Sequence, residues 1–213
     1  MRIPLVLLAL TSACITTSDP RRVEATWSIE QLAGSQASTG SGSAVACPAG
    51  WVTARLVLDG ATGTITDDFP CDAGSGVSSH VPDGSYAAQI DILDAGGNVI
   101  ASSVPTTVEV DGFGPTLETR IFVDAGYAEL AWTFPPNAGT CDGINPFEQI
   151  YLSLDGPSSF TQVFSCHDTR GITSPMLAGE YHASVSWGLI GHGGWDMTIE
   201  APNRVTQLPT VKL

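Results

Sequence analysis

Positive charge is scarce in this sequence. The 213 residues include 8 Lys and Arg against 22 Asp and Glu, which gives a formal net charge of −14, and only 14% of the residues are charged. An acidic surface repels phosphate groups, so a nucleic-acid partner would lack its main source of affinity. We therefore expect a soluble acidic exterior and no nucleic-acid partner.

Helical periodicity is also missing. No stretch sustains apolar residues at a spacing of 3.6, whereas 23 Gly and 14 Pro supply frequent turns. A hydrophobic content of 43% is too high for a disordered chain. The composition therefore predicts an all-β protein.

The common catalytic motifs are absent as well. The chain has no Gly-x-Ser-x-Gly elbow, no His-Glu-x-x-His pair, no P-loop and no dinucleotide fingerprint. We expect no catalytic residue, no metal site and no cofactor, and hence a protein that is not an enzyme. The alternative is a metal-dependent or hydrolase-like accessory enzyme, which a pocket with two histidines and a carboxylate would favour. Its candidate residues are His167, His182 and His192.

The N-terminus has the pattern of an export signal. Arg2 precedes an eight-residue apolar run, residues 3–10, which is too short to cross a bilayer as a helix. Small residues then lead to Cys14. This segment resembles a bacterial lipoprotein signal with its lipobox, which implies cleavage after residue 13 and acylation of Cys14. The alternative is ordinary cleavage that leaves a free thiol at the new terminus of a secreted or periplasmic protein.

The same resemblance implies a location. Ile15, rather than Asp, follows the cysteine, and in such lipoproteins this points to the outer membrane. We expect residues 1–13 to be the signal peptide and residues 14–22 a polar tether, so that an N-terminal lipid makes the membrane a partner. The expected location is therefore the cell envelope.

After the tether, the chain presents the same landmarks twice. Four pairs recur at offsets of 94 to 96 residues. This period matches one small domain and exceeds the period of solenoids and propellers. We therefore expect a tandem duplication, with one domain at 23–124 and a second at 125–213. The pairs are Cys47 and Cys141, Leu58 and Leu154, Cys71 and Cys166, and Tyr86 and Tyr181.

Each repeat alternates apolar and polar residues with a period of two. Apolar side chains take every second position from Tyr86 to Ile92 and again from Tyr181 to Trp187. Short strands of this kind, separated by Gly, Pro and Asp, predict two tandem antiparallel β-sandwich domains of the Ig-like kind. The stretch Pro82–Ile92 resembles a strand start in sandwiches of the carboxypeptidase-regulatory or transthyretin-like kind, which occur in bacterial surface lipoproteins.

The five cysteines divide into two duplicated pairs and one left over. Because each repeat carries one pair, we predict the disulfides Cys47–Cys71 and Cys141–Cys166, with Cys14 left for the lipid. Zinc is the rival for the four thiols, but they lack the close Cys-x2-Cys spacing of zinc sites.

Repeat two departs from repeat one at residues 188–195, a Gly-rich hairpin tip that carries His192 and Trp195. Aromatic side chains on a rigid loop can stack on sugars or on partner side chains, so these two are candidate ligand contacts. The alternative is that Trp195 turns inward as the first core residue of the next strand. We expect a non-enzymatic surface protein that acts as a binding or spacer module, with a surface protein or a glycan as its partner.

Acidic residues gather near Cys71 in repeat one. Calcium needs six or more oxygen ligands, and no EF-hand pattern is present. The sequence leaves open whether these acids bind calcium or are simply solvated. They are Asp59, Asp67, Asp68 and Asp72.

Overall fold

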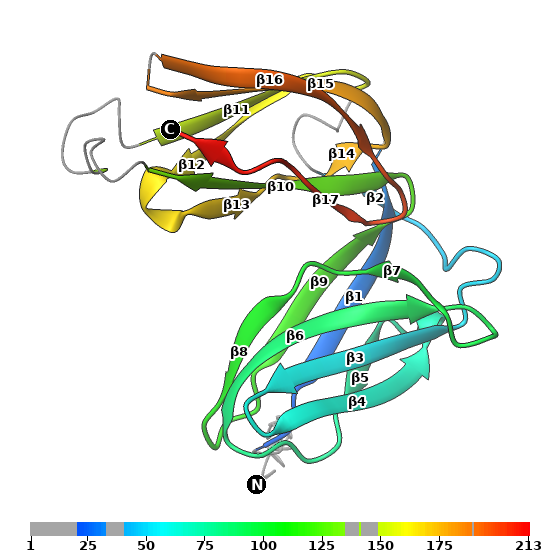
Figure 1. Cartoon of the computed structure of the whole chain (residues 1–213). Helices are drawn as coiled ribbons and strands as arrows, with labels where there is room; N and C mark the ends of the chain where they lie inside the picture. Colours follow the sequence, from blue (N-terminus) through cyan, green and yellow to red (C-terminus); the bar gives the residue numbers. More distant parts are fainter. Residues whose placement is uncertain (1–20, 33–40, 135–140, 142–148, 189) are drawn as a thin grey trace, which may run out of the picture.

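The computed structural model describes residues 21–32, 41–134, 141, 149–188 and 190–213. These residues form strands β1 to β18 and two short 3-10 turns, which confirms the all-β class (Figure 1). Within these ranges no helix is long and apolar enough to cross a membrane. The chain lies in two bodies, drawn at the bottom and the top of Figure 1, and β9 runs almost directly into β10 between them.

The first body, residues 21–122, has a large and a small sheet. In the large sheet the order is β4-β3-β6, and both β7 and β8 pair with the far edge of β6. In the small sheet, β1 pairs with β2, β5 and β9. The large sheet comprises β3 (Thr53–Gly60), β4 (Gly63–Pro70), β6 (Gly84–Leu93), β7 (Val99–Ser102) and β8 (Thr106–Val110). The small sheet comprises β1 (Glu24–Gln31), β2 (Ser43–Ala44), β5 (Ser75–Val77) and β9 (Thr116–Phe122).

The second body repeats this plan. One sheet has the order β12-β11-β15-β16, and the strands of the other pair with β10. The first sheet comprises β11 (Gln149–Asp155), β12 (Phe160–Ser165), β15 (Gly179–Trp187) and β16 (Ile190–Ile199). The second comprises β10 (Ala125–Thr133), β13 (Arg170–Ile172), β14 (Met176–Leu177), β17 (Val205–Gln207) and β18 (Val211–Lys212).

The sequence analysis predicted antiparallel sheets, but some neighbouring strands are parallel. The first and last strands of each body run parallel: β1 lies beside β9 from Glu24↔Thr116 to Glu30↔Phe122, and β10 pairs with β17 and β18. Parallel neighbours require a crossover connection. Here the crossover is the other sheet of the same sandwich, through which the chain passes before it returns to the first strand.

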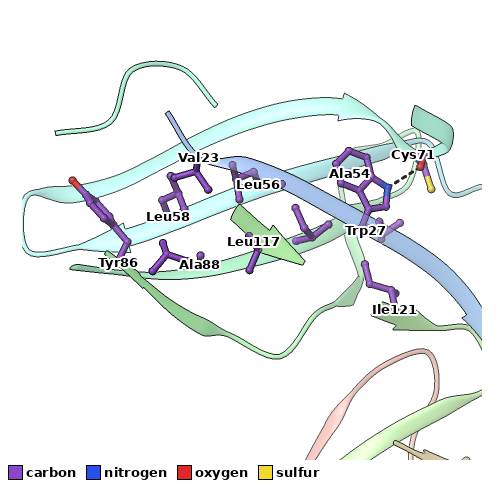
Figure 2. Close-up of a cluster of buried hydrophobic side chains, with 14 of the residues drawn as sticks. Val23, Trp27, Ala54, Leu56, Leu58, Cys71, Tyr86, Ala88, Leu117 and Ile121 are labelled. Carbon is purple, nitrogen blue, oxygen red and sulfur yellow. Dashed lines mark hydrogen bonds between the residues drawn. The ribbon is translucent and has the colours of Figure 1, made fainter. Parts of the chain in front are cut away.

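Both bodies bury the apolar side of the alternation. In the first, Trp27 on β1 and Ile121 on β9 pack in one cluster with Leu56 on β3, and all three are at most 5% exposed (Figure 2). A second cluster in residues 128–213 is built in the same way around Trp132. Each sandwich therefore has its own core, as expected for elements with one apolar face.

The duplication extends to single hydrogen bonds. The Tyr86 hydroxyl donates to the carbonyl of Pro82 at 2.9 Å, and the Tyr181 hydroxyl donates to the carbonyl of Leu177 at 3.0 Å. Each tyrosine thus pins its strand to the residue four positions before it. Such side-chain to backbone bonds satisfy carbonyls that lie outside the sheet ladders.

The two predicted disulfides are both present. Cys47 bonds Cys71 with a Cα–Cα distance of 6.2 Å, and Cys141 bonds Cys166 with a Cα–Cα distance of 5.9 Å. In each pair the second cysteine opens a 3-10 turn, Cys71–Ala73 or Cys166–Asp168. The disulfides therefore close equivalent corners of the two sandwiches.

The two sandwiches meet in a small apolar junction, which we define as Leu32, Phe122, Ala125 and Tyr127. Phe122 and Tyr127 lie on the sides of β9 and β10 that face away from their own cores, because Ile121 and Ala128 take the inward positions. Without the junction these rings would be exposed to water.

Asn203 fastens the junction. It is 1% exposed, and its side chain accepts from the Phe122 amide at 2.8 Å and donates to the Ser102 carbonyl at 2.7 Å. Nearby, Asp124 accepts from the amide of Leu32 at 2.7 Å. Because one buried side chain from the second sandwich satisfies two backbone groups of the first, relative motion would break hydrogen bonds.

The end of the expected tether belongs to the first sandwich. The Arg21 carbonyl accepts from the amide of Val81 at 2.8 Å, and the Arg22 guanidinium donates to the Ser78 carbonyl at 3.3 Å. A tether can therefore extend only to residue 20. Cys14 and the signal peptide lie outside the described residues.

Candidate ligand-binding end of the second sandwich

Strand β16 carries one extra residue where it pairs with β15. Ser184 lies opposite Gly194 and Ser186 lies opposite Gly191, so two residues of β15 span three residues of β16. Gly193 within this bulge has φ +120, a conformation that favours glycine, and a Cβ there would meet nothing within 4 Å. The Gly-rich sequence of the hairpin thus has a conformational cause.

The bulge brings His192 and Trp195 to the same side of β16. Three positions apart on a regular strand, they would point to opposite faces, because side chains alternate. Here Trp195 packs against the second core and the His192 ring lies 6.4 Å from the ring of Trp187. Trp187 in turn meets Phe134 edge to face at 5.2 Å. We call Phe134, Trp187, His192 and Trp195 the aromatic end.

Two polar atoms at the aromatic end have no hydrogen bond. His192 Nε2 and Trp195 Nε1 are buried, and neither finds a partner among the residues that the structure describes. A buried polar group left unsatisfied costs about 1–3 kcal/mol. Both residues are nevertheless only half-buried as a whole, so each remains partly accessible to solvent.

In the matching hairpin of the first sandwich, the polar side chains Asp94 and Asn98 have hydrogen-bond partners. There, Asp94 accepts from the amides of Gly96 and Asn98 at 2.8 and 2.9 Å. The Asn98 side chain also bonds the Asp94 carboxylate, and this bond is the main cause that lowers the pKa of Asp94. The unsatisfied atoms are therefore a property of the second repeat and not of the shared fold.

Trp195 was predicted to be either an exposed ligand contact or an inward core residue, and its position has features of both. It turns inward, as the alternative predicted, while part of its ring stays exposed. No periodicity in the sequence predicted that His192 and Trp195 would lie on the same side of the strand. The adjacent Gly193 and Gly194 were the one available signal, because glycine within a strand pattern often marks a bulge.

The histidines do not gather as the enzyme alternative requires. His182 Nδ1 lies 2.8 Å from Asp196 Oδ1, but both side chains stand on the open outer face of β15 and β16, 60% and 87% exposed. His192 lies on the inner side, and His167 sits in the 3-10 turn beside the second disulfide. His167, His182 and His192 therefore lie at three separate places in the described part of the chain.

The acids of the first repeat point apart. On β4, Asp67 is half-buried and Asp68 is exposed on the opposite face. Arg55 donates to both oxygens of Asp68 at 2.7 and 2.9 Å, which holds the pKa of this carboxyl below its usual range. Asp67 accepts from Ser79 and Asp59 accepts from Thr64. With these oxygens directed to different partners, the four acids do not form one calcium site.

Zinc has a single candidate cluster in the described residues. The Sγ atoms of Cys141 and Cys166 and a ring nitrogen of His167 lie within 4.8 Å of one another. The two thiols are joined in a disulfide. Zinc binds thiolates, so this group cannot hold the ion in its oxidised state.

Comparisons with known proteins give no family. No protein-family model matches the chain, and no curated protein is significantly similar to it. Among solved structures, the TIE protein of Bacillus anthracis is 11% identical with a TM-score of 0.31, over 90% of this chain and 34% of that one. The minor pilin GBS52 of Streptococcus agalactiae is 12% identical with a TM-score of 0.31, over 89% and 95%.

A putative adhesin from Bacteroides ovatus is 10% identical with a TM-score of 0.33, over 82% of this chain and 75% of that one. At such identities and TM-scores, these similarities carry no argument about function.

Proposed function

We propose that this protein is an exported, membrane-anchored surface module that binds a glycan without catalysing a reaction, and that the aromatic end is its contact site. The observation that carries the proposal is the pair of unsatisfied atoms, His192 Nε2 and Trp195 Nε1, which the bulge in β16 holds on one side of that strand. Buried polar atoms that lack hydrogen bonds destabilise the folded state, and where the fold does not require them they are typical of a functional site.

The chemistry of the aromatic end suits a sugar. The faces of Trp187, His192 and Trp195 can stack on the apolar face of a pyranose ring, and the indole N–H and the imidazole can bond its hydroxyls. Because both nitrogens are buried, the partly exposed His192 ring has to turn before a ligand reaches them. Binding would then satisfy two polar groups that lack partners in the free protein.

The proposed cellular location is based on the N-terminal sequence. The apolar run, the small residues after it and the unpaired Cys14 support export and lipid attachment. Two disulfides that close equivalent corners support folding in an oxidising compartment. We place the protein in the cell envelope, at the outer membrane.

A glycan array probed with the mature chain, carrying Cys14→Ser for solubility, tests the proposal. Trp195→Phe removes the unsatisfied N–H but keeps a ring, so the free energy of unfolding should hold or rise while glycan binding falls at least about fivefold. His182→Ala, on the outer face of the same sheet, is the matched control and should bind normally.

Three outcomes would contradict the proposal. Binding to no glycan on the array would leave a spacer role for this chain. Capture of a surface protein instead of a glycan would show that the ligand class is wrong. Glycan binding that survives Trp195→Phe unchanged would show that the contact site lies elsewhere.

A further inference from the structure

A second candidate site lies between the two sandwiches, apart from the aromatic end. A cleft of ≈ 600 Å³ follows the outer face of β1 and β9 and is bounded by the segment at Val104 and Thr106 and, from the second sandwich, by Tyr127 and Pro175. Small-molecule sites typically measure 300–1,000 Å³ and often lie between domains.

Tyr127 contributes a hydroxyl group to the lining of the cleft. The residue is only 8% exposed, and its hydroxyl has no hydrogen-bond partner among the described residues, although the ring is well packed in the junction. Burial raises the pKa of Tyr127 to about 12, so the hydroxyl stays protonated and can donate. In contrast, the other two core tyrosines, Tyr86 and Tyr181, each donate to a backbone carbonyl.

The wall of the cleft is rich in neutral hydroxyls. β1 and β9 pair in parallel with Thr26 opposite Glu118 and Ser28 opposite Arg120, so these side chains line one face. Thr106 adds a further threonine to the lining, and the Ser28 hydroxyl, which donates to Glu30 at 2.7 Å, can still accept a hydrogen bond. A hydroxyl both donates and accepts, as a sugar hydroxyl does, whereas carboxylate or phosphate ligands need donors alone.

The charges in the cleft are balanced and slightly acidic. The Arg120 guanidinium lies 3.8 Å from the Glu30 carboxylate and stacks 5.5 Å over the ring of Phe122. Glu118 adds a further negative charge to the lining. The cleft therefore does not favour an anion, and the net charge of −14 repels one from a distance.

The cleft is also held in shape. Its two sides belong to different sandwiches, and the Asn203 side chain of the second sandwich joins them through hydrogen bonds to the Phe122 amide and the Ser102 carbonyl of the first. A preformed site loses less entropy when it binds. From these observations we infer that the cleft binds a small neutral saccharide, with the Tyr127 hydroxyl as its central hydrogen-bond donor.

Tyr127→Phe separates a ligand role from a structural one. The phenol oxygen has no partner in the described protein, so its removal should leave the free energy of unfolding at neutral pH unchanged or slightly higher. If a saccharide bonds this hydroxyl, the same substitution should weaken saccharide binding about fivefold or more. Tyr151→Phe, which removes a hydroxyl from the outer face of β11, is the matched control.

The experiment is an NMR titration of the mature chain with Cys14→Ser. The probes are glucose, galactose, mannose, N-acetylglucosamine, maltose and cellobiose, each raised to about 20 mM, because weak sugar sites have millimolar dissociation constants. The expected result is that at least one sugar shifts the amide signals of Thr119, Tyr127 and Thr106 and that Tyr127→Phe weakens this response.

The titration also distinguishes this site from the aromatic end. Trp195→Phe should leave the response at the cleft unchanged, whatever the glycan array shows. The inference is overturned if none of the six sugars shifts these signals, or if Tyr127→Phe binds as tightly as the wild type.

Discussion

The indole nitrogen of Trp27 donates a hydrogen bond of 2.9 Å to the carbonyl oxygen of Cys71 (Figure 2). In the second sandwich, Trp132 donates to the carbonyl of Cys166 at 3.0 Å. In each case the bond ties the first strand of the sandwich, β1 or β10, to the turn that carries the disulfide. The core tryptophan and the disulfide of each repeat therefore act as one structural unit.

Removing this donor should destabilise the protein. Trp27→Phe leaves the buried Cys71 carbonyl without a partner and opens a small space beside Phe69, whose ring lies 6.0 Å away. We expect the free energy of unfolding to fall by about 2–4 kcal/mol. Urea unfolding measures the change. Trp132→Phe should cost a similar amount, and a loss in one repeat alone would contradict their equivalence.

The disulfides should be independent of each other. Replacing both Cys47 and Cys71 by Ser should cost about 3 kcal/mol, and the same change at Cys141 and Cys166 should cost about as much. Non-reducing peptide mapping of the wild type should yield one linked peptide from each repeat. A peptide that joins Cys47 to Cys141 would refute the pairing.

The free energy of unfolding should fall at alkaline pH because of Tyr127 in the junction. Burial raises the pKa of folded Tyr127 from the ordinary value of 10.0 to about 12. The unfolded chain therefore loses this proton first, and the free energy of unfolding should fall by up to about 2 kcal/mol between pH 10 and pH 12. Tyr127→Phe should flatten this part of the profile. Equal slopes for the variant and the wild type, by urea unfolding at several pH values, would contradict the prediction.

The anchor should depend on one sulfur atom. Wild-type protein expressed with its signal should fractionate with membranes and label with a palmitate analogue, because a lipid on Cys14 would hold it there. Cys14→Ser should abolish the label and release the chain. Soluble wild-type protein with a mature N-terminus other than Cys14 would rule out the anchor.

Features set by local patterns could be predicted from the sequence. Alternation placed Tyr86 and Tyr181 on buried strands, and the duplication paired the cysteines correctly without any three-dimensional information. Both inferences depend on a period of two or on a repeated spacing, which the chain displays directly.

Features set by tertiary contacts could not be predicted. Tyr127 occupies an outward position of its strand and is buried in a cluster that includes Leu32 and Phe122 of the other sandwich. The bulge in β16 depends on how two strands align, and one inserted residue reverses the side on which His192 lies. Local periodicity indicates neither which residues of the other sandwich contact Tyr127 nor how β15 and β16 align.

The central claim is that the chain consists of two duplicated sandwiches, each with its own core, and that the second carries the proposed aromatic contact site. Thermal unfolding of a fragment comprising residues 125–213, followed by circular dichroism under oxidising conditions, tests this claim most directly. We expect one cooperative transition, at a lower temperature than in the full chain because Tyr127 and Asn203 lose their partners in the first sandwich. A fragment that shows no cooperative transition, or that aggregates through unpaired strand edges, would contradict the account.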